Sequence, residues 1–381
     1  MLSNERRYHR IPLANQIQLL FLLLLAGCNP LYVIEAAIHE GQILANRIPI
    51  EKVITEGKST AQDVRALTFV KEARAFANER GLSVGDAFSS FSPTDEDSVV
   101  WVVMGCKPDS FEAKSWWFPI VGRVPYKGFF SKDDALMTAK ELQDEGFETF
   151  VRGATAFSTL GWFNDPVLTP LLSHQPTLVV NTIIHELVHR TVWIPEDVSF
   201  NESLANYLGH AETLAFFLRR HPQDNALSND ATQRLAREIG ISALSEKLYQ
   251  QLSTIYASSS PRDEKLRNKR ASFAKADATA KEFELAFDLF SRANNAEFLQ
   301  VYLYFRQLAI FDALYRHRNG DLRAFLDDIR RFQRNLSRRR SAGDDLFSHF
   351  ERYVRSVIDT SPRHSAFNLT PQALPQMRTN R

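Results

Sequence analysis

The chain has 381 residues, of which 44% are hydrophobic and 24% are charged. This composition is typical of a folded protein with a full hydrophobic core, and it excludes an intrinsically disordered chain. Lysine and arginine together number 46, against 45 aspartate and glutamate residues, so the charge balance argues against a nucleic-acid-binding protein.

The N-terminus has the pattern of a bacterial lipoprotein signal. Positive charge in NERRYHR (4–10) precedes the apolar run IQLLFLLLLAGC (17–28). This run is too short to span a bilayer permanently and fits the apolar part of a secretory signal. Its last four residues, LAGC, match the lipobox, in which cleavage occurs before a lipidated cysteine. We therefore expect a signal peptide over 1–27 and acyl chains on Cys28.

The residue after the lipobox, Asn29, differs from the aspartate pattern of lipoproteins retained in the inner membrane. This difference predicts an outer-membrane anchor that faces the periplasm, with the acyl chains supplying the membrane affinity. The alternative is a plain signal peptide with a coincidental cysteine. The other cysteine, Cys106, has no partner for a disulfide if Cys28 is acylated, and we expect a small buried residue near a strand end rather than a nucleophile.

A small α/β layer is expected over 98–160. A helix over 59–82, capped by Ser59 or Thr60 and stopped by Gly81, precedes it. The layer itself combines a continuous β-branched strand, an aromatic segment with turns, a helix and a second strand; these are SVVWVVMG (98–105), 115–130, 131–146 and 147–160.

The second half of the chain reads as helix from Pro176 onward. We expect a charged surface helix over 260–293, a helix over 296–317 and another over 320–334. Residues 361–381 are polar and contain proline, which predicts a flexible tail. Without internal repeats or low-complexity linkers, residues 28–360 are expected to form a single domain.

The stretch TIIHELVHRTVW (182–193) carries the residues with the clearest chemistry. On a helix, His185 and His189 lie one above the other, so both can bind one Zn²⁺ while Glu186 points toward the water to be activated. Apolar neighbours surround these residues, and burying three such polar groups is unfavourable unless they are paired or coordinated. The alternative is that hydrogen bonds in the core satisfy both imidazoles.

A catalytic zinc needs a third protein ligand. A histidine six residues after His189 would indicate the metzincin pattern, but Pro195 stands there. The better candidate is Glu202 on the following helix, since small residues at Ala205 and Gly209 share its face and would let the two helices approach closely. Glu202 can also be read as a first-turn glutamate favoured by the helix dipole; Glu196 and Asp197, in the loop, are weaker ligand candidates.

HELVH followed by NESLA resembles the gluzincin metallopeptidases and, more narrowly, the "predicted aminopeptidase" family of bacterial lipoproteins. Four further blocks resemble that family, so the similarity covers nearly the whole mature chain; they are GQILANRIPIEKVI (41–54), WWFPIVGRVPYKGFF (116–130), STLGWFNDPVL (158–168) and NNAEFLQVYLYF (294–305). Phe157 and Trp117 depart from the expected tyrosine and cysteine, which puts the substrate cleft in doubt but leaves the metal residues intact.

The resemblance implies an α+β, predominantly helical fold, in which zincin-like active-site helices (176–220) lie beside the α/β layer and a helical part (225–360) follows. It also implies a zinc peptidase with one Zn²⁺ held by His185, His189 and Glu202, and with Glu186 as general base. Peptides in the cell envelope would be the substrates, and the membrane would be reached through Cys28.

The remaining site residues are assigned by role. Asn181, Asn201 and Asn206 are candidates for holding the imidazoles, and Tyr304 or Tyr302 for stabilising the oxyanion. The segment ATAFSTLGW is expected to pair with an extended substrate, through its residues Ser158, Thr159 and Gly161. The alternatives are a non-catalytic binding or chaperone lipoprotein on the same fold and, less favoured, a zinc hydrolase of non-peptide amides.

Overall fold

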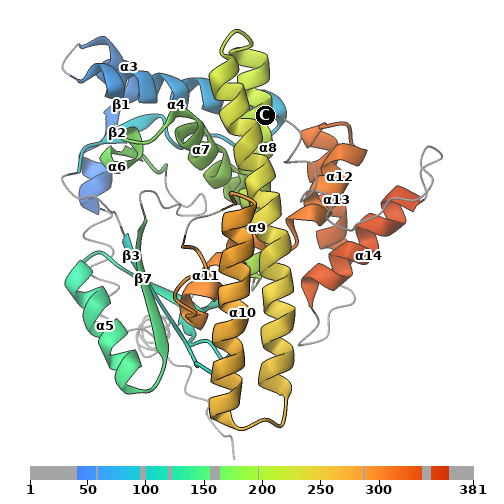
Figure 1. Cartoon of the computed structure of the whole chain (residues 1–381). Helices are drawn as coiled ribbons and strands as arrows, with labels where there is room; N and C mark the ends of the chain where they lie inside the picture. The colour runs from blue at the N-terminus through green and yellow to red at the C-terminus, as the bar shows by residue number, and fades with distance from the viewer. Residues whose placement is uncertain are drawn as a thin grey trace, which may run out of the picture.

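The structure is a computed structural model (Figure 1). It describes eight stretches of the chain, namely residues 41–56, 59–94, 100–118, 122–154, 164–195, 197–285, 288–336 and 345–359. The lipobox with Cys28, the segment 155–163 and the C-terminal residues 360–381 lie outside these stretches, so the predictions made for them stay predictions.

The N-terminal part is built around helix α4 (Ala61–Arg80). Thr60 caps it in a capping box with Asp63, and Gly81 ends it at φ +99°, a left-handed conformation that favours glycine. The apolar face of α4, including Leu67 and Val70, is buried against the helix that carries the histidines. Short elements complete this part: β1 (Ile48–Pro49), α3 (Ile50–Thr55), β2 (Ser90–Ser92), β8 (Val167–Leu168) and α6 (Thr169–Leu172).

An antiparallel sheet forms the expected α/β layer. Its strand order is β6-β3-β7, with β3 (Val100–Cys106) in the centre, β6 (Tyr126–Phe129) on one side and β7 (Glu148–Ala154) on the other. Helix α5 (Lys132–Asp144), capped by Ser131 as expected, covers the face that carries Val103. A separate hairpin of β4 (Trp116–Phe118) and β5 (Gly122–Val124) lies in the same part of the chain.

The other face of this sheet packs on helix α11 (Asn295–Phe305). Met104 pairs with Tyr126 and with Phe150, and these side chains contact Leu299 and Leu303 of α11. Cys106 ends β3 on this face and is fully buried, as expected for a small apolar residue, and burial raises the pKa of its thiol to about 12.

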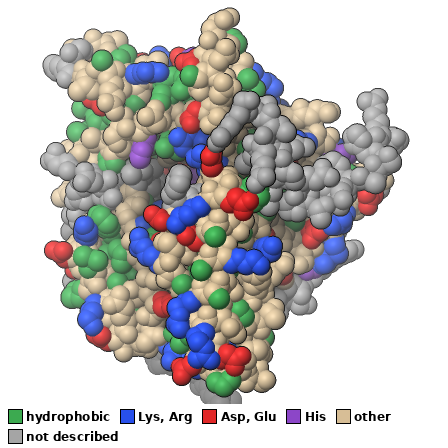
Figure 2. All heavy atoms as spheres, in the orientation of Figure 1, with side chains coloured by type: hydrophobic (Ala, Val, Ile, Leu, Met, Phe, Trp, Pro, Cys, Tyr) green, Lys and Arg blue, Asp and Glu red, His purple; other side chains and the backbone are tan. Residues whose placement is uncertain are grey.

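Long helices make up the rest (Figure 1). In chain order they are α7 (Pro176–Thr191), α8 (Val198–Arg220), α9 (Asn225–Ala257), α10 (Arg262–Glu282), α12 (Leu308–His317), α13 (Leu322–Leu336) and α14 (Leu346–Asp359). The largest core joins α4, α7, α8 and α12–α14. On the face in Figure 2, cationic and anionic side chains are intermingled, in keeping with the balanced composition.

Two helix boundaries differ from the sequence prediction. The helix expected over 260–293 ends at Glu282, because Glu284 takes a left-handed conformation (φ 53°) and Leu285 N–H donates to Ala280. The helix expected over 296–317 is broken at Gln307, also left-handed at φ 51°. There the backbone N–H groups of 306, 307 and 308 donate to side chains of Ser203, Glu246 and Ser242 instead.

The predicted fold class is confirmed in its coarse form, since the chain is predominantly helical with small sheets. In the stretches that are described, no helix combines the length and apolar character needed to cross a bilayer.

Candidate metal centre

Helix α7 presents both motif histidines on one side. Pro176 occupies the first helical position, where a missing N–H is tolerated. The helix is held by fully buried neighbours such as Ile184 and Leu187, while His185 and His189, four residues apart, project together. His189 is only 6% exposed.

Helix α8 can approach α7 closely because residue 209 is glycine. A Cβ atom on Gly209 would lie 2.9 Å from Asn181 Nδ2, so that side chain would have to turn aside, and 3.4 Å from the Asn181 carbonyl oxygen of α7. Ala205, on the same face, is fully buried. The small residues thus act as the sequence predicted, and they place Glu202 opposite the histidines.

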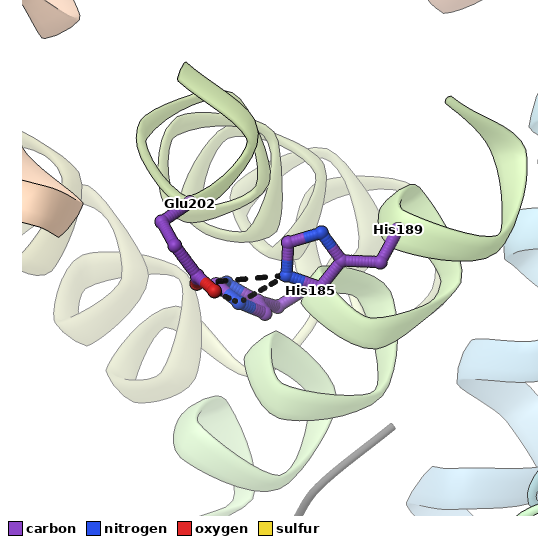
Figure 3. A group of neighbouring side chains, drawn as sticks. All are labelled: His185, His189 and Glu202. Carbon is purple, nitrogen blue, oxygen red and sulfur yellow. Dashed lines mark hydrogen bonds and ion pairs between the residues drawn. The ribbon is translucent and has the colours of Figure 1, made fainter. Parts of the chain in front are cut away.

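The three predicted ligands meet at one point (Figure 3). Glu202 Oε2 lies 3.4 Å from His185 Nε2 and 3.5 Å from His189 Nε2. The two Nε2 atoms are 3.1 Å apart. Glu202 is 8% exposed, so it is no solvated first-turn glutamate.

These separations fit a tetrahedral ion. Two ligand atoms that are each 2.0–2.1 Å from a tetrahedral zinc ion are about 3.3 Å apart, and the observed separations run from 3.1 to 3.5 Å. Two imidazoles and one carboxylate are also a donor set that zinc takes in catalytic sites, with a fourth position left open.

The charge on Glu202 is stabilised from the histidine side. Burial acts to raise the pKa of its carboxyl, but His189 and the hydrogen bonds from both imidazoles outweigh burial and hold the pKa below its usual range. His189 Nδ1 is buried without a hydrogen-bond partner in the described residues. The side of that ring away from Glu202 is therefore not fixed by an acceptor.

Glu186 lies within electrostatic range of His185 and Glu202, and it makes no hydrogen bond or ion pair with any described residue. Burial raises the pKa of its carboxyl to about 7; His185 opposes the shift, and the carboxylates of Glu202 and Asp165 add to it. A partly buried carboxyl that titrates near neutrality is suited to accept and return a proton.

A second group of polar residues reaches the centre from the sheet and α11. The Tyr304 ring lies over that of His185, with centroids 6.2 Å apart, and its hydroxyl accepts from Arg152 Nη2 at 3.0 Å. Burial, and then the charge of Glu202, raise the pKa values of both Tyr304 and Tyr126, so these two hydroxyls stay protonated.

Sequence reasoning missed Arg152 and Tyr126. Arg152 lies two residues after Phe150 in β7, so both side chains are on the sheet face that packs on α11. A charged residue at an inward position of a strand was the available signal. Tyr126 gave none, because only the register of β6 on β3 places it level with Met104 and Phe150 on the sheet face that packs on α11.

The predicted asparagine roles differ in the structure. Asn201 pairs with the backbone of Ile194 at both its N–H and its carbonyl, which closes the loop before α8. Asn206 donates to Glu238 and to the Tyr304 carbonyl, and Asn181 Nδ2 has no partner among the described residues. None of the three bonds to an imidazole there, since Asn201 and Asn206 on α8 are directed to backbone groups and to α9, and the Asn181 amide on α7 faces Gly209.

The other predicted residues are placed as follows. Tyr302 lies in a separate aromatic cluster, stacked on Tyr249 and directed toward Glu246 rather than the histidines. Asp197 precedes α8 and is absent from the ligand group. Ser158, Thr159, Gly161 and Glu196 lie outside the described residues.

A family model described as "Putative aminopeptidase" matches residues 31–343, most of the chain. The chain belongs to this family. No curated protein and no solved structure is similar enough to match it.

Membership of the putative aminopeptidase family supports a peptidase, and hence a hydrolase, at a coarse level. The matched region contains every residue of the metal centre and of the polar group around Tyr304, whereas Cys28 lies just before it.

Proposed function

We propose that this putative aminopeptidase is a zinc-dependent peptidase of the gluzincin type. The observation that carries the proposal is the convergence of His185, His189 and Glu202, whose ligand atoms lie at the separations of a tetrahedral site. When bound there, zinc would supply a Lewis acid that polarises the scissile carbonyl and makes water easier to deprotonate.

Glu186 supplies the proton transfers. Its carboxylate takes a proton from the attacking water and then delivers it to the nitrogen of the leaving amine, which is the task of a general base that becomes a general acid. Burial and the pKa near 7 support this role, because the group can hold either state at neutral pH. A site built only for structure needs no such base beside its ligands.

Tyr304 stabilises the oxygen on which negative charge develops. Its hydroxyl is protonated and sits at the rim of the histidine pair, so it can donate to that oxygen. Tyr126, whose hydroxyl lies within electrostatic range of the same carboxylates, is the second candidate donor.

The setting proposed for this activity is the bacterial cell envelope. It rests on the lipobox ending at Cys28 and on Asn29. A lipid anchor in the outer membrane would hold the enzyme on the periplasmic side, where peptides are its substrates. Globomycin, an inhibitor of lipoprotein signal cleavage, should then cause a larger, uncleaved form to accumulate.

The deciding measurement is zinc content. Protein lacking residues 1–28 should carry one zinc per chain, and Glu202→Ala should lose most of it. Glu238→Gln is the matched control, since Glu238 is a neighbouring partly buried carboxylate outside the ligand group. A folded wild type that refuses added zinc would sink the peptidase proposal and leave the binding-module alternative; zinc uptake with no cleavage of any free or blocked peptide would separate metal binding from activity.

A further inference from the structure

Strand β7 and helix α11 run alongside each other and are joined by polar contacts at both ends (Figure 1). At one end Asn295 N–H donates to Glu148, and at the other Arg152 donates to Tyr304. The spacing agrees, since four strand residues and nine helix residues each rise about 13 Å. Arg152 is therefore carried to the metal centre by the same packing that fixes α11.

The guanidinium of Arg152 is held in a defined orientation. With the Gln300 amide turned so that its oxygen faces Arg152, Oε1 accepts from Nη2 at 3.0 Å and from Nε at 3.1 Å. The second Nη2 proton goes to the Tyr304 hydroxyl, and the guanidinium carbon lies 5.4 Å from the centre of the Tyr304 ring. Gln300 is one helical turn before Tyr304, so a single helix presents both partners.

These contacts leave the phenol proton available. An oxygen that accepts from Arg152 directs its own O–H elsewhere, and no acceptor for the Tyr304 proton lies among the described residues. Arg152 itself forms no ion pair with a described carboxylate, so its charge is not neutralised by a direct partner. A donor hydrogen-bonded to a cation is a stronger donor, because the cation withdraws electron density from its oxygen.

We propose that Arg152, clamped by Gln300, is a positioning residue that holds the Tyr304 hydroxyl as the hydrogen-bond donor to the substrate oxyanion. This inference rests on the proposed function, in which Tyr304 serves that oxygen. The guanidinium also determines which residue donates, because it donates to the Tyr304 hydroxyl and makes no comparable hydrogen bond to Tyr126 among the described residues. Arginine is required over lysine, since only a planar fork can hold Gln300 and Tyr304 at once.

The test measures binding of acetohydroxamate, a small oxyanion ligand of zinc, to the zinc-loaded full chain in detergent by calorimetry. Tyr304→Phe and Arg152→Met should each weaken binding by about 10- to 100-fold. The double variant should bind no more weakly than Tyr304→Phe alone, because both changes remove one hydrogen bond. Arg152→Lys should restore only part of the loss, and Gln300→Leu should fall between Arg152→Met and wild type.

Tyr302→Phe is the matched control, because that tyrosine lies on the same helix but contacts Glu246, and its binding should be unchanged. Zinc content is read in every sample. Additive losses in the double variant, loss in Tyr126→Phe instead, or loss of zinc in Arg152→Met would each overturn the positioning role. A wild type without zinc overturns the proposed function as well, whereas zinc with unaltered hydroxamate binding in Arg152→Met overturns this inference alone.

Discussion

Two clusters of charged side chains inside this protein differ in how their charges are balanced. The first, at the start of β7, surrounds Lys269, whose side chain is 2% exposed. Its ammonium donates to both oxygens of Glu148, at 2.6 and 2.7 Å, and to the Pro108 carbonyl at 3.1 Å. Three donors meet three acceptors and the charges cancel, so the cluster is complete within the chain.

The metal centre is the second cluster, and it is not complete. Two imidazoles and the carboxylates of Glu202 and Glu186 converge there, with no lysine or arginine ion-paired to either carboxylate among the described residues. A buried ring nitrogen of His189 also lacks a partner among the described residues. Buried anions of this kind are expected where a cation belongs. The comparison separates a cluster whose charges are paired within the chain from one whose side chains could hold a metal ion.

The largest expected effect comes from Glu186→Gln, which changes the second cluster without touching a ligand. Peptidase activity should fall by about 10²- to 10⁴-fold, because the general base is lost. Zinc content should be unchanged, and the free energy of unfolding should not fall, since an unpaired, partly buried carboxyl becomes a neutral amide. Measuring turnover, zinc content and urea unfolding on one preparation tests all three expectations. A variant that keeps its activity but loses stability would show that Glu186 stabilises the fold and does not transfer the proton.

Lys269→Met should give the converse result in the first cluster. Removing the cation leaves Glu148 charged and without its partner, which should lower the free energy of unfolding by about 3–5 kcal/mol. Zinc content and turnover of the folded fraction should stay as in wild type. Adding Glu148→Gln should recover part of the loss, as seen in urea midpoints. If Lys269→Met lost zinc while keeping its stability, the two clusters would not be independent.

The helix caps and the three candidate ligands could be predicted from local sequence. Thr60 and Ser131 cap their helices, and the HELVH spacing with small residues at 205 and 209 brings the ligands together. These features depend on residues within a few turns of one another. The charged helix expected on the surface, α10, buries one face, formed by Lys269, Phe273, Ala276 and Ala280, and nothing in its own sequence marks that lysine as buried.

The contacts that could not be predicted join distant parts of the chain. The break at Gln307 depends on side chains of α8 and α9 that accept its neighbours' N–H groups. Arg152 and Tyr304 meet only because β7 and α11 pack side by side with Glu148 next to Asn295. The secondary-structure propensities of the two segments hold no information about this alignment. Helix boundaries and site residues that arise from tertiary contacts therefore cannot be predicted from hydrophobic periodicity and sequence motifs.

Gly209→Ala should show how closely the helices must approach. The new methyl group lies 2.9 Å from the Asn181 amide nitrogen, so that side chain must turn aside, and it also crowds the Asn181 carbonyl oxygen at 3.4 Å; unfolding free energy should fall by about 1–3 kcal/mol. Zinc should bind more weakly, because crowding between α7 and α8 separates Glu202 from the histidines. Gly240→Ala is the matched control: its methyl meets the flexible end of Leu285, away from the centre, so any loss of stability there should leave zinc affinity unchanged.

The smallest expected effect concerns Glu238, a partly buried carboxyl close to the candidate metal centre that neither cluster includes. Burial raises its pKa from 4.5 to about 7, although Asn206 donates to it. His210 Nε2 lies 3.7 Å from Glu238, too far for a hydrogen bond, and burial lowers the pKa of His210 to about 3. Burial thus favours the neutral form of each partner over an ion pair.

The sign of the pH dependence follows from proton binding. Between about pH 4.5 and 7 the folded protein keeps a proton on Glu238 that the unfolded chain releases, so this group makes stability fall as pH rises. Glu238→Gln should remove that contribution, changing the slope by up to about 1.4 kcal/mol per pH unit. His210 acts in the opposite direction below pH 6.5 in both proteins, so the difference between their urea curves isolates Glu238. Parallel curves across this window would mean that Glu238 is ionised in the folded state, with Asn206, Arg237 and Arg234 outweighing its burial.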